Sequence, residues 1–335
     1  MLRLQTLVFL ILISSHALSD NRQGTLAGVW DNDIFTGTDR NYTNGLRVNW
    51  VGETAESEAP GFLGSGYSQA LKNVLGFLPH VGDARLNHSG SIALRQIMVT
   101  PEDIQSPQLL PNQAPYIGYT HIDTALYAWD ERTFYEYQLT LGAVGPDSGA
   151  ASTQQFMHKV LGSDKPQGWD NQIDRRYIAE LTYVEGHKVF KTANDNGLGW
   201  DLTLNYGASL GNYESGLSAG GLIRYGQNLK NNFNVYYTES ASESALIGQF
   251  DGQQGAGWQA YFGFYGTALA YNYIEEAIKE THNFDIQPIT ASAIYGFAYF
   301  TDQFVLGFSL QGNSSPIQQS DEPIRFGTMY FIFNI

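Results

Sequence analysis

The chain of 335 residues carries 33 acidic and 18 basic side chains, for a formal net charge of −15. This balance argues against a basic groove for nucleic acid. The absence of cysteine excludes a disulfide framework. Glycine, with 36 residues, and the aromatic residues tyrosine (21) and phenylalanine (19) are abundant, and this composition in strand-like alternation is typical of an outer-membrane β-barrel.

The chain begins with a segment typical of a secretory signal peptide. Arg3 precedes a run of apolar residues at 7–13, and small residues follow at Ala17 and Ser19. The apolar run is too short to span a bilayer as a helix. We therefore predict a signal peptide over 1–19 and one outer-membrane domain over 20–335.

Alternating polarity predicts strands along the rest of the chain. The alternation is clearest at the end, where Phe326, Thr328 and Ile332 share one face. The predicted strands are 25–35, 41–51, 90–100, 114–129, 132–145, 174–190, 197–210, 215–228, 256–271, 286–299, 303–313 and 324–335. Their even number predicts an all-β fold, a twelve-stranded antiparallel transmembrane β-barrel with a short helix in an extracellular loop. A soluble β-sandwich has a similar period and is the alternative.

Counting strands also assigns the connections to the two ends of the barrel. With both termini in the periplasm, connections 36–40, 101–113 and 145–173 face the cell exterior. The connections 52–89 and 229–255 would then be unusually long for periplasmic turns. Residues 67–77 in the first of them have the pattern of an amphipathic helix, which we expect at the inner membrane–water boundary.

The first predicted hairpin is rich in oxygen ligands. Asn32, Asp33, Asp39 and Thr43 supply carboxylate, amide and hydroxyl oxygens, which suit a hard cation such as Ca²⁺. Adjacent strand residues point to opposite faces, so Asn32 and Asp33 can share a site only if the strand bulges or ends there. Ordinary turn chemistry is the alternative interpretation of these residues.

The connection 145–173 contains a predicted helix. Turn-forming residues at 145–149 precede a helical pattern that ends at Gly162. Gln154 and His158 are four residues apart and project from one face of this helix. An oriented histidine beside a cation can activate water against an ester. A solvated loop histidine without a catalytic role is the alternative.

These motifs in combination resemble the outer-membrane lipid A 3′-O-deacylase family. The residues that carry the resemblance are Asn32-Asp33 with the run 39–45, the 145–162 segment with Gln154 and His158, and the run Trp169–Ile173. The resemblance covers essentially the whole mature chain. It implies a twelve-stranded barrel that removes the 3′-linked acyl group of lipid A with a divalent cation, usually Ca²⁺.

The resemblance also implies a site between the outer barrel wall and the helix of an extracellular loop. His158 takes the place of the general base, and Asp164 that of a glutamate near the site. The other positions of the site fall on Asn32, Asp33, Thr43 and Gln154. The metal ligands implied are Asp33, Asn32 and Asp164. Lipopolysaccharide is the expected substrate, and we expect a monomer in the outer membrane without a nucleic-acid partner.

The chain departs from the family pattern in the second external connection. Members of the family can have adjacent lysine and arginine residues there, whereas residues 100–107 include no basic residue. Recognition of a substrate phosphate at this place is therefore in question. Two alternatives follow, a phospholipase-like hydrolase of another envelope lipid and a non-catalytic structural or binding barrel.

Overall fold

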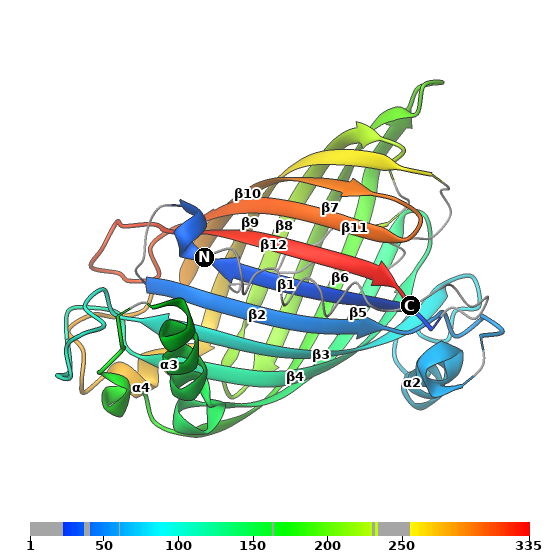
Figure 1. Cartoon of the computed structure of the whole chain (residues 1–335). Coiled ribbons are helices and arrows are strands. Elements are labelled where there is room, and N and C mark those ends of the chain that lie inside the picture. Colours follow the sequence, from blue (N-terminus) through cyan, green and yellow to red (C-terminus); the bar gives the residue numbers. More distant parts are fainter. Residues whose placement is uncertain (1–22, 37–40, 60, 163, 230–231, 234–254) are drawn as a thin grey trace.

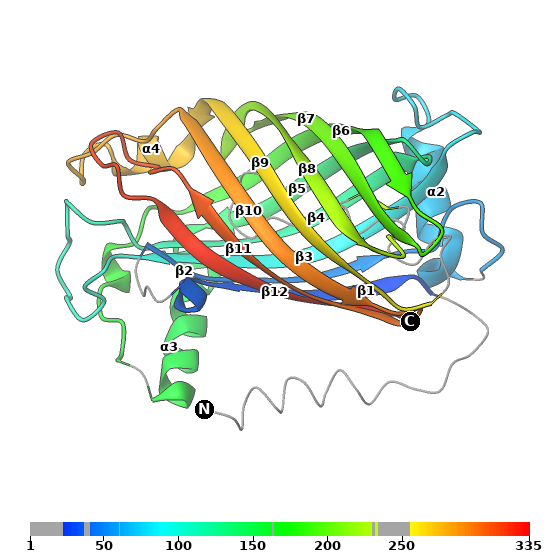
Figure 2. The same cartoon turned by 90° about the horizontal axis from the view of Figure 1, so that it is seen from above.

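The computed structural model describes residues 23–36, 41–59, 61–162, 164–229, 232–233 and 255–335. The predicted signal peptide and Asp39 lie outside the described residues. The described chain forms twelve strands, each antiparallel to the next, and β12 pairs with β1 to close the barrel (Figures 1 and 2). The predicted fold class is therefore confirmed.

The strands agree with the predicted ones to within a few residues at most ends. Their bounds are β1 Thr25–Asn32, β2 Asn41–Val51, β3 Asn87–Thr100, β4 Ile117–Trp129, β5 Thr133–Val144, β6 Arg176–Ala193, β7 Leu198–Gly211, β8 Glu214–Gln227, β9 Gly257–Asn272, β10 Ile289–Phe300, β11 Phe304–Asn313 and β12 Ile324–Asn334. The difference that matters for the candidate site is at β1. This strand ends at Asn32, not at residue 35, and the 3₁₀ turn η1 (Asp33–Thr36) follows it.

The two faces of the barrel wall differ in polarity. Residues that face outward, such as Leu94 of β3 and Ile122 of β4, are exposed and apolar. Their neighbours along the same strands, Arg95 and Asp123, face the lumen and are buried. A polar lumen with an apolar outer band is the pattern of a transmembrane barrel, and it is the reverse of a soluble sandwich, whose interior is apolar.

Among the described residues, no helix combines the length and the apolar character needed to span a membrane.

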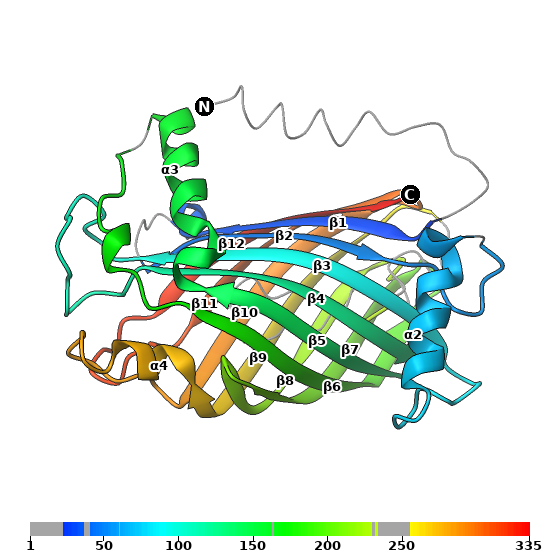
Figure 3. The ribbon, with the colours of Figure 1, turned by 90° about the horizontal axis from the view of Figure 1, so that it is seen from below.

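The two ends of the barrel carry different elements (Figures 1 and 3). We call them the α3 rim and the α2 rim. The α3 rim bears η1, η3 (Gly145–Ser148), α3 (Ala150–Leu161), η4 (Trp169–Asn171) and α4 (Tyr273–Ile278). The α2 rim bears η2 (Phe62–Gly66) and α2 (Tyr67–Leu75), together with the C-terminus. The first hairpin and the helix with His158 therefore share one rim, as the strand count predicts.

An apolar cluster fills the inside of the barrel at the α3 rim. It includes Tyr119 of β4 and Phe326 of β12, together with Tyr273 and Ile278 of α4, and all four side chains are buried. Helix α4 was not predicted from the sequence. Its start is fixed by Asn272, whose Oδ1 accepts a hydrogen bond from the main-chain N–H of Ile274 at 2.7 Å.

Within the β8–β9 connection 229–255, the structure describes residues 232–233 inside the barrel, and most of the expected periplasmic connection lies outside the described residues. Phe233 is fully buried beside lumen-facing aromatic side chains of β4 and β5. The main-chain oxygen of Asn232 accepts hydrogen bonds at 3.1 Å from Lys188 Nζ and from Arg224 Nη2. Buried hydrogen-bond donors of the wall thus hold residues 232–233 inside the barrel.

Helix α2 lies on the outer wall at the other rim. Tyr67 and Leu71 cover Gly90 of β3, and Gly90 N–H donates to Ser68 Oγ at 2.9 Å. Large apolar side chains around α2 are exposed, including Phe77 with 81% of its surface. They extend the apolar outer band of the barrel, which supports the expected place at the membrane–water boundary; that placement stays a prediction.

Candidate active site

Helix α3 is attached to the outer wall of the barrel at its N-terminal end. Gly118 of β4 faces outward, as does the exposed Ile122 further along the strand. A Cβ atom on Gly118 would lie 2.2 Å from Ser148 Oγ and 2.5 Å from Ala150 Cβ. The missing side chain therefore lets the start of α3 approach the strand. The buried cluster at this contact consists of Met98, Tyr116, Ala150 and Trp169.

Gly118→Ala should detach α3 from the wall. Overpacking costs about 1–3 kcal/mol, which is about 5- to 150-fold in the population of the detached helix. Proteolysis at Lys159 of the folded barrel should become faster to a similar extent. Gly28→Ala is the matched control, because a Cβ atom there meets nothing within 4 Å. Equal cleavage rates in the two variants would contradict the role given to Gly118.

Gln154 is held by Trp169. Its side chain is only 3% exposed, and its Oε1 accepts a hydrogen bond from Trp169 Nε1 at 2.7 Å. The indole can only donate, so the amide presents its oxygen to Trp169 and its NH₂ group to the other side. Nε2 is buried and has no hydrogen-bond partner among the described residues. Its N–H groups are available to an oxygen atom of a bound molecule.

His158 follows Gln154 one turn further along the same stripe of α3. Its Nδ1 is hydrogen-bonded to the main-chain oxygen of Asp164 at 2.5 Å. A carbonyl oxygen only accepts, so the neutral imidazole carries its proton on Nδ1 and its lone pair on Nε2. The helix ends at Gly162, with φ of 73°, and the chain can then turn back to bring residue 164 to the imidazole. This is the tautomer that a general base needs at Nε2.

The second connection of the α3 rim fastens the loop that follows α3. Gln105 Nε2 donates to the Asp164 carboxylate at 2.6 Å, and Gln167 N–H donates to the Ile104 oxygen at 2.8 Å. Tyr116 OH donates to the same Ile104 oxygen at 3.2 Å. Burial raises the pKa of the Tyr116 phenol, which keeps it protonated as a donor. The segment without basic residues thus supports the partner of His158.

The first hairpin meets the condition set by its sequence. β1 ends at Asn32, so Asn32 and Asp33 are not forced to opposite faces of a continuing strand. Asn32 Oδ1 accepts a hydrogen bond from the Ile34 N–H at 2.9 Å and so begins the η1 turn. Asp33 is buried, with 1% of its surface exposed. Thr43 lies at a bulge of β2, and its side chain is outside the described part of the structure.

The residues proposed from the sequence fall into two groups on one rim. Hydrogen bonds join His158 to Asp164 and Gln154 to Trp169. Within the described chain, neither His158 nor Gln154 is hydrogen-bonded to the first hairpin. β2 lies between β1, which leads into η1, and β3, which α3 contacts together with β4. The structure therefore places the α3 residues on one stripe of the helix and the hairpin residues on the same rim, with β2 between β1 and the strand that α3 contacts.

Asp33 and Asn32 could supply only some of the oxygen ligands that a cation needs. Asp33 offers a buried carboxylate, whereas Asn32 Oδ1 already holds the η1 turn. The residues that the structure describes include no group of three or more His, Asp or Glu side chains that could hold a metal. Ca²⁺ takes 6–8 oxygen ligands. Asp33 would therefore need main-chain, water or substrate oxygens to complete the site.

Several residues that shape the site were not assigned a role from the sequence. Trp169 orients Gln154, Gly118 admits α3, and the main-chain oxygen of Asp164 sets the tautomer of His158. Asp164 was proposed as a metal ligand, and that role stays a prediction. Gly145-Pro146 at the start of η3 marks the turn into α3 in the sequence. Gly118 is different, because a glycine in a strand does not indicate which helix will pack on it.

Comparison with known proteins shows the family to which this barrel belongs. A family model described as outer membrane protein LpxR matches residues 4–335. LpxR from Salmonella typhimurium has a similar solved structure, with a TM-score of 0.74 and 17% sequence identity over 93% of this chain and 100% of that chain. The β domain of the Bordetella autotransporter BrkA matches with a TM-score of 0.44 and 8% identity, over 92% of this chain and 98% of that chain.

No curated protein matches the chain at a significant level. The likeness to the Salmonella structure extends the agreement to the fold, including the closed antiparallel barrel. Since the family model covers nearly the whole sequence, the chain belongs to the LpxR family of outer-membrane proteins, the lipid A deacylase family that its motifs resemble.

Proposed function

We propose that this protein hydrolyses the 3′-linked acyl or acyloxyacyl ester of lipid A in a Ca²⁺-dependent reaction, with His158 as the general base. The observation that carries the proposal is the hydrogen bond from His158 Nδ1 to the Asp164 carbonyl, which leaves Nε2 as the basic nitrogen. Membership of the family and the attachment of α3 to the outer wall support the same conclusion.

In the proposed reaction, His158 Nε2 takes a proton from water as the water oxygen attacks the acyl carbonyl carbon. The buried Nε2 donors of Gln154 are suited to orient the water or to bind the carbonyl oxygen as it becomes negative. The bond from the acyl carbon to the sugar oxygen then breaks, and His158 returns the proton to that oxygen. The products are a fatty acid and a lipid A with a 3′ hydroxyl group.

Asp33 is the residue that would hold the cation, together with the Asn32 region of the same hairpin. When bound there, Ca²⁺ would polarise the acyl carbonyl as a Lewis acid. Thr43 and Asp164 are proposed as further residues of the site. The exposed side chains of Lys159 and Lys165 on the α3 loop, and of Arg325 beside η1, supply positive charge for lipid phosphates on this rim.

Mass spectrometry of lipid A tests the activity directly. Cells that express the protein should yield lipid A that lacks the mass of the 3′ acyl or acyloxyacyl group, compared with cells that do not. Purified, folded protein should release the same fatty acid in Ca²⁺, and EDTA should stop the release. Intact lipid A after incubation with folded protein and Ca²⁺ would rule the proposed activity out.

A phospholipid substrate is the second candidate, because the 100–107 segment has no basic residue for a glucosamine phosphate. Its residues instead fasten the loop after α3. Incubating the folded protein with labelled phospholipid and with lipid A separates the two substrates. We expect faster hydrolysis of lipid A, and faster hydrolysis of phospholipid would replace the proposed substrate by the second one.

Trp169→Phe should slow the hydrolysis about tenfold. Phenylalanine keeps most of the ring packing but removes the hydrogen bond that orients the Gln154 amide, a contribution of about 1–1.5 kcal/mol. The effect should appear in kcat. Trp200→Phe on the exposed outer wall of β7 is the matched control. Unchanged kcat in Trp169→Phe would show that the amide orientation does not matter for the reaction.

A further inference from the structure

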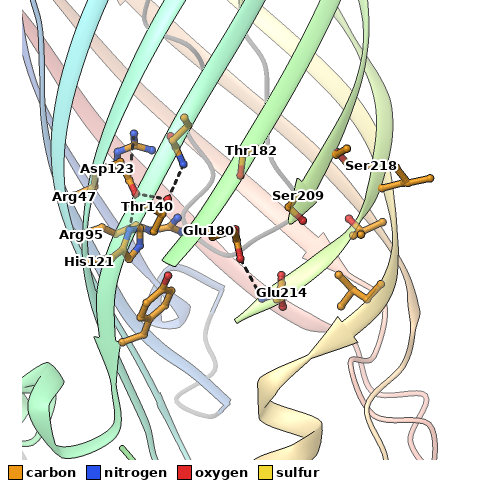
Figure 4. A pocket seen from close by; sticks show the side chains of 17 residues that line it. Arg47, Arg95, His121, Asp123, Thr140, Glu180, Thr182, Ser209, Glu214 and Ser218 are labelled. Carbon is orange, nitrogen blue, oxygen red and sulfur yellow. Dashed lines mark hydrogen bonds and ion pairs between the residues drawn. The ribbon is translucent and has the colours of Figure 1, made fainter. Parts of the chain in front are cut away.

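The lumen of the barrel contains a polar pocket that has no part in the α3 site. It lies inside the wall, whereas α3 lies outside (Figures 3 and 4). Arg47, Arg95, His121 and Asp123 of β2–β4 line one side, and Glu180 and Glu214 line the other. The space measures about 750 Å³, part of it open to solvent. Tyr119 of the apolar cluster borders it toward the α3 rim.

Three nitrogen-bearing side chains form a row across the inner face of this pocket. In the strand register Arg47 lies opposite Arg95, and Arg95 lies opposite His121. Arg95 is only 6% exposed and His121 only 4%. Like charges at directly opposite positions of a sheet destabilise it. Negative charge close to the row is therefore needed to stabilise it.

Asp123 supplies that charge to only part of the row. Its Oδ1 accepts hydrogen bonds from His121 Nδ1 at 2.7 Å and from Thr140 Oγ1 at 2.8 Å. Its Oδ2 lies 3.9 Å from Arg47 Nη2. Arg95 has no such carboxylate among the described residues, and its buried Nε and Nη2 atoms lack hydrogen-bond partners there. Burial of a guanidinium group without an acceptor is costly.

We propose that this pocket binds one small oxyanion, such as phosphate or sulfate, on Arg95. Nε and Nη2 lie on one edge of the guanidinium group, and their parallel N–H bonds match two oxygens of a tetrahedral oxyanion. His121 lies opposite Arg95 in the strand register, and its Nε2, which also lacks a partner within the described chain, adds a donor when the imidazole is protonated.

The opposite side of the pocket limits the ligand to a single small anion. Glu180 accepts a hydrogen bond from the Glu214 N–H at 3.1 Å, and Glu214 accepts one from Asn272 Nδ2 at 3.0 Å. These two carboxylates repel a second anion or a long polyanion. The ligand class is therefore a free oxyanion rather than a charged polymer.

Anomalous diffraction from crystals soaked in selenate, an analogue of sulfate and phosphate, tests the proposal. A selenium peak should appear with its oxygens within hydrogen-bond distance of Arg95 Nε and Nη2. In solution at constant ionic strength, phosphate at ten times its dissociation constant should raise the melting temperature by about 3 °C relative to chloride. Chloride is the control because it is monatomic and cannot bring two oxygen atoms to Arg95. Only water at Arg95 in the soaked wild-type crystal would overturn the proposal.

Arg95→Gln should abolish both the selenium peak and the phosphate-dependent rise in melting temperature. Arg132→Gln, at an exposed arginine of the β4–β5 turn, should keep both. A phosphate-dependent rise of equal size in Arg95→Gln would contradict the assignment to Arg95. If Arg95→Gln does not fold, the wild-type soak and the comparison of phosphate with chloride still decide the question.

Discussion

His158→Ala should lower the rate of lipid A deacylation by about 10²–10⁴-fold, the usual contribution of a general base. The loss should appear in kcat, because the imidazole acts on the attacking water and not on the acyl chain. His158→Gln should be similarly slow, since an amide can hydrogen-bond but cannot take the proton. The measurement is fatty-acid release from lipid A by purified protein with Ca²⁺ in excess.

The barrel should remain folded in this variant, because His158 is on a surface helix and its one hydrogen bond within the described chain is to a neighbouring loop. Heat-modifiable gel mobility reports the fold. His282→Ala, at a histidine of the same rim that follows α4, is the control and should keep full activity. Near-normal deacylation by folded His158→Ala would remove His158 as the base, and a wild type that is inactive in every assay would favour the non-catalytic barrel.

Asp33→Ala should have an effect of comparable size for a different reason. The buried Asp33 carboxylate is proposed to hold the cation, so its loss should remove the response of the rate to Ca²⁺. Asp33→Asn keeps one oxygen ligand, and high Ca²⁺ should partly restore its rate. The same excess should not restore His158→Ala.

The double variant Asp33→Ala with His158→Ala should be little slower than the slower single variant, because groups that act on one step are strongly non-additive. Asp321→Ala, at an exposed acidic residue of the β11–β12 connection, is the control for charge. Multiplicative losses in the double variant would mean that the hairpin and α3 act on separate steps. A full response to Ca²⁺ in Asp33→Ala would place the cation elsewhere.

Most strands could be predicted because successive residues of a barrel wall alternate between the lipid-facing and the lumen-facing side. In β12, Phe326, Thr328 and Ile332 share one face, as predicted, and all three side chains are buried. The predicted strand 25–35 runs three residues beyond Asn32, where β1 ends. Phe35 instead turns onto the outer face of β12, where Gly327 leaves room for its side chain.

The interior of the barrel was harder to predict, because it depends on contacts between distant strands. Residues 232–233 lie outside the predicted strands, and their burial follows from hydrogen bonds to Lys188 of β6 and Arg224 of β8, which the pairing of β6, β7 and β8 brings together. The same holds for the site. The spacing of Gln154 and His158 is local and visible in the sequence, whereas the Trp169 hydrogen bond depends on how the loop folds back.

The attachment of α3 to the outward face of the wall places the proposed base His158 on the side of the barrel that faces the membrane. Moving a twelve-carbon chain from a bilayer into water costs about 10 kcal/mol, at about 0.8 kcal/mol for each CH₂ group. A site beside the lipid-facing surface avoids this cost, because the substrate arrives by lateral diffusion with its chains still in the leaflet. For the proposed hydrolysis, turnover should therefore depend on the mole fraction of substrate in the membrane plane, and diluting the leaflet with inert lipid should slow it even when the total amount of substrate is unchanged.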